Sequence, residues 1–172
     1  MTLLKKNNIK VSGSGKKTML FAHGYGCDQN MWRFVAPAFQ ADYRTVLFDH
    51  IGAGQSDLSA YSRTRYSTLN GYADDVLNIC RELDLREVTF VGHSVSAMIG
   101  VLAALKEPER FEKLVLIGPR PATSMTATTS VASPGRTSTG CSSPWMTITW
   151  AGRARWPPSS WAIRIARSWG RS

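Results

Sequence analysis

The segment GHSVS, residues 92–96, has the residue types and spacing of a catalytic serine turn. It follows the apolar run Val88–Val91 and leads into the apolar stretch Val95–Leu105, which predicts a tight turn from a strand into a helix. The start of a helix favours negative charge, because unpaired N–H groups point outward there. The pattern therefore predicts Ser94 as a nucleophile, with the N–H of Val95 as one donor to the oxyanion that forms on attack.

The usual pattern for this turn is G-x-S-x-G, and Ser96 stands at its last position. Serine is small, so the departure is mild. The alternative is an ordinary turn in which Ser94 only caps the helix. A second motif, FAHGYG, places the N–H of Tyr25 where it would complete the oxyanion hole. His23 resembles a base, but its position beside a glycine at a strand end favours a structural role.

A third glycine-rich segment, DHIGAGQSD, follows the apolar run RTVLF. It has Gly52 and Gly54 but Asp57 where a dinucleotide-binding G-x-G-x-x-G motif needs its third glycine. We therefore expect a tight loop fixed by Asp49 and Ser56, and no nucleotide cofactor.

The remaining metal-ligand residue types are scattered. His50 and His93 are interpreted as loop neighbours, and no His/Cys/Asp cluster has the spacing of a metal site. The cysteines, Cys27, Cys80 and Cys141, are odd in number and far apart, which favours free thiols over a disulfide framework. The sequence thus predicts no cofactor and no metal.

Apolar runs alternate with amphipathic stretches over the first 121 residues, which predicts an α/β fold with a mostly parallel sheet and helices on both faces. Chemistry in such folds gathers at the carboxyl ends of the strands, where the three motifs lie. We expect strands at 9–11, 19–22, 44–48, 88–91 and 114–117, and helices at 30–39, 68–83 and 95–105. Four polar residues of the second helix are expected to face water: Asp74, Asp75, Asn78 and Glu82.

Four segments together resemble the α/β-hydrolase group of the bacterial stress-signalling hydrolase RsbQ and the plant strigolactone and karrikin receptors. They are FAHGYGCDQNMW, LFDHIGAGQSDLSAY, RYSTLNGYADDVL and VGHSVSAMIG, and the resemblance covers about residues 5–121. It implies a Ser–His–Asp hydrolase of small esters or lactones with roles in signalling. Ser94 matches the family nucleophile, Tyr25 and Val95 match its oxyanion-hole positions, and Ser96 agrees with the plant members.

The other two triad members have no counterpart. In α/β-hydrolases the acid and then the histidine follow the serine, yet no histidine follows Ser94 in these 172 residues. The acids after it are Glu107, Glu109 and Glu112, which come too early for the role. We therefore expect the chain as written to be essentially inactive as an enzyme.

Residues 122–172 differ sharply from residues 1–121. They contain six Arg, five Trp, 18 Ser plus Thr and no Asp, Glu or Leu, whereas about a quarter of an average protein is charged. This composition predicts a non-native or disordered tail, translated out of frame from a slip between Gly118 and Ala122. When each codon is started at the third base of the one before, the DNA of residues 145–152 can encode LDDNYLGW, which is similar to a lid segment of the family. Residues 160–170 admit MGNPDRPELG, and residues 121–132 admit RYLNDGDYVGG, which also resemble the relatives.

The net charge of +9 and pI near 9.9 suggest a nucleic-acid or membrane-surface binder when the chain is taken whole. Most of that charge lies in the tail, and residues 1–121 carry only +3. No apolar run approaches the roughly 18–20 residues of a membrane span. The N-terminus lacks the apolar core of a secretory signal. We expect a cytoplasmic protein that binds neither membrane nor nucleic acid.

Two other functions compete with ester or lactone hydrolysis. One is a stress-signalling or ligand-sensing role like that of RsbQ, in which the intact protein contacts a regulatory phosphatase. The weaker one is nucleic-acid binding through the Arg/Trp-rich tail. The sequence also predicts that the run LVLI, residues 114–117, forms an exposed apolar sheet edge, because the strands that would normally flank it are missing.

Overall fold

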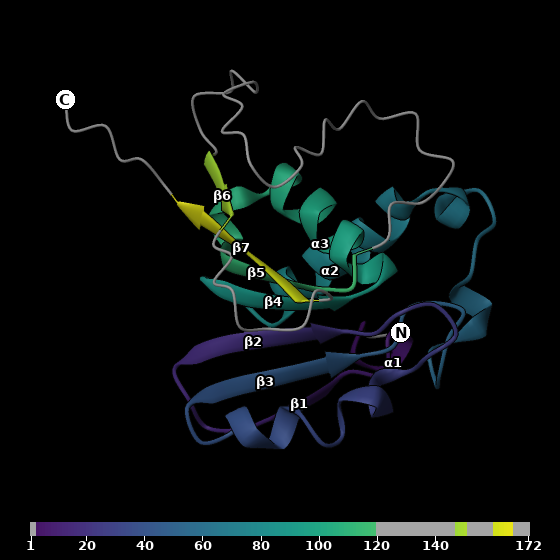
Figure 1. Ribbon diagram of the computed structural model, residues 1–172. Coiled ribbons are helices and arrows are strands. Elements are labelled where there is room, and N and C mark those ends of the chain that lie inside the picture. Colours follow the sequence, from purple (N-terminus) through teal and green to yellow (C-terminus); the bar gives the residue numbers. More distant parts are fainter. Residues whose placement is uncertain (1–2, 120–146, 151–159, 167–172) are drawn as a thin grey trace.

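The computed structural model describes residues 3–119, 147–150 and 160–166, with side chains for residues 5–119. Its centre is one twisted sheet in the order β1-β3-β2-β4-β5-β7-β6 (Figure 1). The strands are β1 (Lys10–Ser12), β2 (Lys17–Ala22), β3 (Tyr43–Phe48), β4 (Val88–His93), β5 (Phe111–Ile117), β6 (Thr147–Trp150) and β7 (Ser160–Ala166).

The four strands β3, β2, β4 and β5 run parallel, as the sequence predicts. β2 and β4 have almost no exposed residues, which explains why they are apolar without alternation. Ala22 at the end of β2 pairs with Phe48 on one side and Gly92 on the other. This register brings the loops after β2, β3 and β4 to one edge of the sheet.

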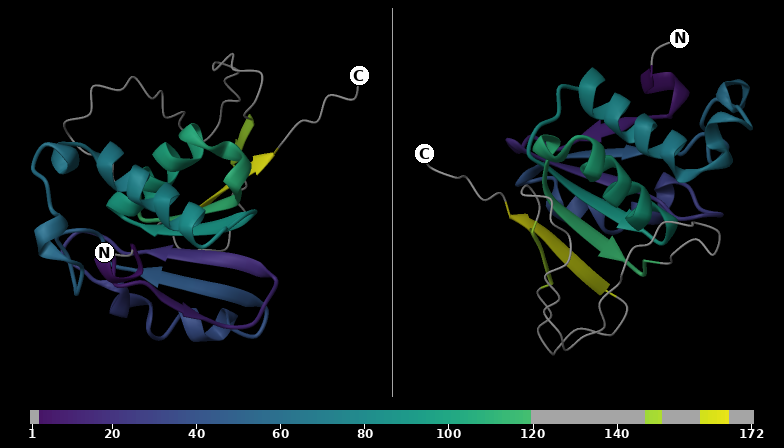
Figure 2. Two further views of the ribbon diagram at one scale, coloured as in Figure 1. Left: turned by 180° about the vertical axis from the view of Figure 1, so that it is seen from behind. Right: turned by 90° about the horizontal axis from the view of Figure 1, so that it is seen from above.

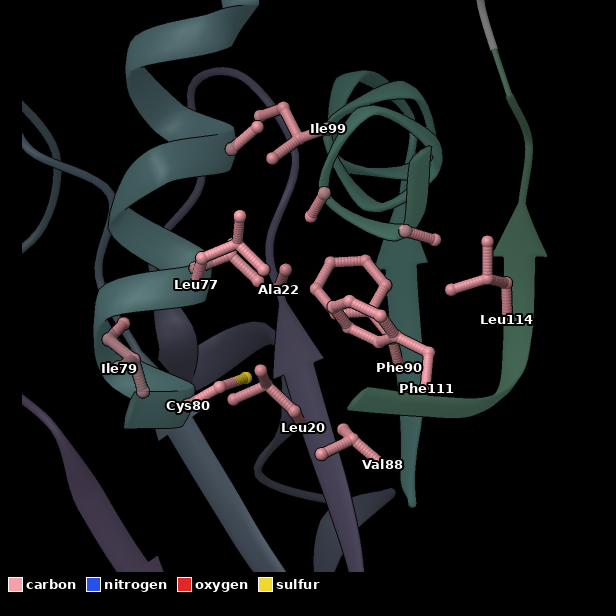
Figure 3. Close-up of a cluster of buried hydrophobic side chains, with 14 of the residues drawn as sticks. Leu20, Ala22, Leu77, Ile79, Cys80, Val88, Phe90, Ile99, Phe111 and Leu114 are labelled. Atoms are coloured by element: carbon pink, nitrogen blue, oxygen red, sulfur yellow. The ribbon is translucent and has the colours of Figure 1, made fainter. Parts of the chain in front are cut away.

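One face of the sheet is covered by two α-helices, α2 (Leu69–Glu82) and α3 (Val95–Lys106) (Figure 2). Their apolar sides pack on β2, β4 and β5 in a core that includes Leu77, Ile99, Phe90 and Phe111 (Figure 3). Phe90 and Phe111 meet edge to face, with ring centroids 6.3 Å apart. Both helices were predicted within about one residue of their observed ends. The short helix α1 (Leu3–Lys6) was not predicted.

Asp75 corrects the prediction for the polar side of α2. It is 1% exposed, although the helical periodicity places it among residues that face water. The carboxylate accepts hydrogen bonds from Arg65 Nη2 at 2.8 Å and from the Tyr66 hydroxyl at 2.7 Å. The segment before the helix therefore folds back over this side of α2. Three neighbouring positions, Asp74, Asn78 and Glu82, are at least partly exposed as expected.

The opposite face of β2 and β3 is covered by two 3₁₀ helices, η1 (Gln29–Trp32) and η2 (Ala36–Phe39). The sequence predicted one continuous helix over 30–39, and this is wrong. Pro37 near the start of η2 has no N–H to continue a helix, and it restricts the residue before it. Trp32 nevertheless packs on Phe21 of β2, with ring centroids 5.3 Å apart. Three further 3₁₀ turns are η3 (Leu58–Ala60), η4 (Arg65–Ser67) and η5 (Pro108–Arg110).

The exposed edge expected at β5 is not observed. β7 pairs antiparallel with β5, from Lys113 opposite Arg164 to Ile117 opposite Ser160, and β6 pairs antiparallel with β7. The sequence of β7, SWAIRIA, alternates apolar and small or polar residues and contains the residue types that favour strands. Such a segment satisfies the backbone groups of β5. Beyond Pro119 the structure describes only residues 147–150 and 160–166, and their pairing does not test the frame prediction, which stays a prediction.

Candidate active site

Ser94 lies at the junction of β4 and α3, in a backbone conformation that is rare for a side-chain-bearing residue. Its φ is 55° and its ψ is −116°. This region is almost exclusive to glycine, so the turn stores strain. A Cβ added to Gly92 would lie 2.6 Å from the carbonyl oxygen of Ser96, which explains why the position before the turn is glycine. The strand–turn–helix context of the motif is therefore present.

The loop after β2 lies against this turn. A Cβ on Gly24 would be 3.3 Å from the Cβ of Ser94 and 2.5 Å from Nδ1 of His93. Only glycine allows the loop to approach so closely. Tyr25, the next residue, is 95% exposed, and its side chain therefore contributes little to the core. The structure thus brings together Ser94 and the loop that carries Tyr25, as the sequence predicts.

Two N–H groups at this junction are available to a ligand. Neither the N–H of Tyr25 nor that of Val95 has a hydrogen-bond acceptor among residues 5–119. Val95 begins α3, where the first N–H groups have no partner within the helix. The N–H of Ser94, by contrast, donates to the carbonyl oxygen of Ile117 at 2.8 Å. The electrostatics of the junction favour an anion, because the positive end of the α3 dipole adds to the free N–H groups.

His23 is a structural residue in this arrangement. It is 1% exposed, and its Nδ1 donates to the carbonyl oxygen of Gly24 at 2.9 Å. Its Nε2 accepts from the backbone N–H of His50 at 3.0 Å. Both ring nitrogens are therefore occupied, which agrees with the sequence interpretation. Among the described residues, no histidine and no carboxylate forms a hydrogen bond with the hydroxyl of Ser94.

His50 and Ser96 form a buried pair beneath the turn that sequence reasoning missed. His50 Nε2 is 2.7 Å from the Ser96 Oγ, and the Ser96 Oγ is 2.5 Å from the carbonyl oxygen of His23. Burial, and then the neighbouring His23, lowers the pKa of His50 to about 3. The imidazole is therefore neutral at physiological pH. The available signal was the departure from the usual glycine at Ser96, which places a hydroxyl inside the fold.

Asp49 fixes the loop after β3, as expected. Its buried carboxylate accepts from the backbone N–H of Gln55 at 2.9 Å, from that of Gln29 at 2.8 Å and from Asn8 Nδ2 at 2.7 Å. Burial by itself raises the pKa of Asp49, but these hydrogen bonds outweigh it and hold the pKa below its ordinary value. Ser56 closes the same loop by accepting from the N–H of Gly52 at 3.1 Å.

Metal and membrane signals are missing from the part of the chain that the structure describes. No three His, Cys, Asp or Glu residues converge there, and no helix is long and apolar enough to cross a bilayer. One open hollow of about 430 Å³ lies beside the loop after β2, and Ser94 does not line it. Its lining residues are Gly26, Cys27, Asp28, Asn30, Met31, Arg33 and Gly54.

The mostly parallel sheet, the strained serine turn and the glycine loop beside it are the features of the α/β-hydrolase fold. Residues 17–159 match the family model described as the alpha/beta hydrolase fold, and the chain belongs to that family.

Its relatives include plant receptors and esterases. The chain is 45% identical over 115 residues to the Karrikin insensitive 2 receptor CA of Petunia hybrida, which covers 67% of this chain and 43% of the receptor. It is 44% identical over 116 residues to the Strigolactone esterase D14 of Arabidopsis thaliana, again covering 67% of this chain and 43% of the relative. A solved hydrolase from Oleispira antarctica is 47% identical, with a TM-score of 0.68 over 69% of this chain and 44% of that one. The chain thus spans less than half the length of these proteins.

Proposed function

We propose that residues 1–121 are the nucleophile-bearing part of a serine hydrolase that acts on small esters or lactones. The observation that carries this proposal is the backbone of Ser94, held at φ 55° and ψ −116° at the start of α3 and directly beside Gly24. Backbone strain of this kind is found mainly at functional sites. A serine that only capped the helix would have an ordinary extended conformation, so capping does not explain the strain. The esterase names among the relatives support the choice of substrate class.

In the proposed reaction, the Ser94 Oγ attacks the carbonyl carbon of the ester and the carbonyl oxygen becomes an oxyanion. The N–H groups of Tyr25 and Val95 donate to that oxyanion, and the α3 dipole adds to their effect. The serine proton must pass to a base, and the base must then protonate the leaving alcohol. Residues 1–172 supply no histidine after Ser94 for this step, and His23 and His50 are occupied in the core.

Without that base, the chain as written is inactive in this proposal. Loss of the catalytic serine or histidine lowers kcat by about 10⁶ in a well-studied protease. We expect p-nitrophenyl acetate hydrolysis by the purified chain to equal that of its Ser94→Ala variant. Robust turnover that Ser94→Ala abolishes would contradict the inactivity, while leaving Ser94 as the nucleophile.

The missing base and acid would be encoded in another reading frame of the gene. That frame begins at a slip between Gly118 and Ala122. Sequencing of the encoding DNA tests the idea: the codons of residues 145–152 admit LDDNYLGW in that frame, and the idea fails if the DNA cannot encode such a family segment there. The protein made from the continued frame is expected to hydrolyse p-nitrophenyl acetate, and Ser94→Ala is expected to abolish this. Unchanged turnover in that variant would rule out Ser94 as the nucleophile.

Ligand sensing is the second candidate, favoured by relatives whose names identify them as receptors. The 95% exposure of Tyr25 beside the turn leaves an aromatic surface that a ligand or a covering segment would contact. Contact with a regulatory phosphatase would belong to the intact protein. Calorimetric titration of the chain with a small lactone tests this role. Binding that survives Ser94→Ala would favour sensing, whereas absence of binding in both would count against it.

A further inference from the structure

The Ser96 hydroxyl connects the two segments that carry the free N–H groups. It lies on the first turn of α3, one residue after Val95, and it reaches the carbonyl oxygen of His23, two residues before Tyr25. Ser96 is fully buried, with 0% exposure. A glycine, the usual residue at this position, would leave that carbonyl without the bond.

The direction of each hydrogen bond follows from the chemistry of the groups. The His23 carbonyl oxygen can only accept, so the single hydroxyl hydrogen of Ser96 points to it. His50 Nε2 must then donate to the Ser96 oxygen. The hydrogen of the imidazole is therefore on Nε2, and Nδ1 of His50 is bare, buried and without a partner among the described residues. One orientation of the hydroxyl satisfies both bonds.

His50 is held in turn by the groups packed around it. Its backbone N–H donates to His23 Nε2 at 3.0 Å, and its ring meets those of Phe48 and Tyr72 edge to face at 5.1 Å and 5.5 Å. Rotation of the imidazole would break the two ring contacts, while the backbone bond fixes the main chain that carries it. Because its donor is fixed, the orientation of the Ser96 hydroxyl is fixed as well.

We propose that Ser96 is a positioning residue, which holds the loop of the Tyr25 N–H against the turn of the Val95 N–H and so sets the width of the oxyanion hole. The role in an oxyanion hole rests on the proposed function, whereas the contact between the loop and the turn can be tested without any measurement of catalysis. Gly24 and His93 are in contact across the same junction, yet they form no hydrogen bond there. The hydroxyl supplies the directional contact that packing alone lacks.

The test uses ¹⁵N NMR of the 172-residue chain and three variants. In Ser96→Ala we expect the amide order parameter of Tyr25 to fall from about 0.85 to below about 0.6, the range of a flexible backbone. Ser96→Thr keeps the hydroxyl and is expected to restore the parent value. Thr45→Val is the matched control, because it removes another buried hydroxyl, bonded to the Ser12 carbonyl at 3.1 Å, at a distance from the site. It is expected to leave Tyr25 unchanged.

Equal order parameters for Tyr25 in the parent and Ser96→Ala would overturn the proposal, as would an equal loss in Thr45→Val. The parent chain alone gives a second measurement, which applies even where a variant fails to fold. Its imidazole ¹⁵N shifts are expected to identify His50 as protonated on Nε2, and protonation on Nδ1 would overturn the proposal. Ser94→Ala is expected to leave the Tyr25 order parameter and the His50 shifts unchanged. These NMR measurements therefore test the role of Ser96 separately from the role of Ser94 as nucleophile.

Discussion

Ser94 and Gly24 face each other across the carboxyl ends of β4 and β2, so closely that a Cβ on Gly24 would lie 3.3 Å from the Cβ of Ser94. The contact joins the strained turn to the glycine loop. The contact depends on the absence of a side chain at Gly24, whose φ is not in the left-handed region. The glycine is therefore required by space and not by backbone conformation.

Gly24→Ala is expected to destabilise the chain by about 1–3 kcal/mol, the usual cost of adding a methyl group to a packed site. The added Cβ would lie 2.5 Å from Nδ1 of His93, so the imidazole must move. Urea denaturation of the parent and the variant measures the loss. In the Gly24→Ala/His93→Ala double variant the clash is absent, and the two costs should not add. Simple additivity would contradict the steric explanation.

Ser94→Gly is expected to raise the free energy of unfolding by about 1 kcal/mol relative to Ser94→Ala. Glycine adopts the φ of 55° and ψ of −116° without the steric cost that any Cβ incurs. Alanine keeps that cost while removing the hydroxyl, so the pair of variants separates strain from chemistry. Urea denaturation at one pH measures the difference. Equal stabilities would mean that the turn relaxes and stores no strain.

The strands and the two long helices were predictable because their patterns are local. The apolar runs of β2 and β4 and the stripe of α2 depend only on which faces are buried. The position of Ser94 was predictable too, since a small-residue turn between a strand and a helix is itself a local pattern. The errors have local and distant causes. Pro37 divides a segment whose apolar spacing suits one helix. Asp75 is held by Arg65 and Tyr66 just before the helix, and also by Lys6 near the start of the chain, whose Nζ lies 3.5 Å from its carboxylate.

The sequence signals a hydroxyl at Ser96 in place of the usual glycine, but it does not identify the partners of that hydroxyl beneath the site. Ser96 bonds to a carbonyl 73 residues away and to a ring 46 residues away. The motif records only that the residue is small. The antiparallel pairing of β5 with β7 was missed for a different reason: the composition of residues 122–172 led to their interpretation as an out-of-frame tail, although SWAIRIA within it has a strand pattern. Pairings of this kind are set by the backbone groups that a sheet edge leaves free.

Asp75→Ala is expected to destabilise the chain by about 2 kcal/mol or more, because the Tyr66 hydroxyl loses its acceptor and the Arg65 guanidinium loses its ion pair. Asp74→Ala is the matched control on the same helix. Its carboxylate is 47% exposed and pairs with Lys106 at the surface, so its loss should cost less than about 1 kcal/mol. Urea denaturation of both variants compares them. Similar losses would contradict a buried network at Asp75.

Stability should fall as the solution is acidified from pH 7.5 to pH 5, and His50 is the expected cause. Burial lowers its pKa from 6.5 to about 3, so between these values the unfolded chain binds a proton that the folded chain does not. The free energy of unfolding is unaffected above the unfolded pKa and declines below it. At pH 5 the loss from this one group is about 2 kcal/mol. Urea denaturation at both pH values measures it. In His50→Gln the amide has no proton to gain, so the decline should shrink by about that amount. An undiminished decline in that variant would assign the acid sensitivity to other groups and contradict the neutral, buried imidazole beneath Ser96.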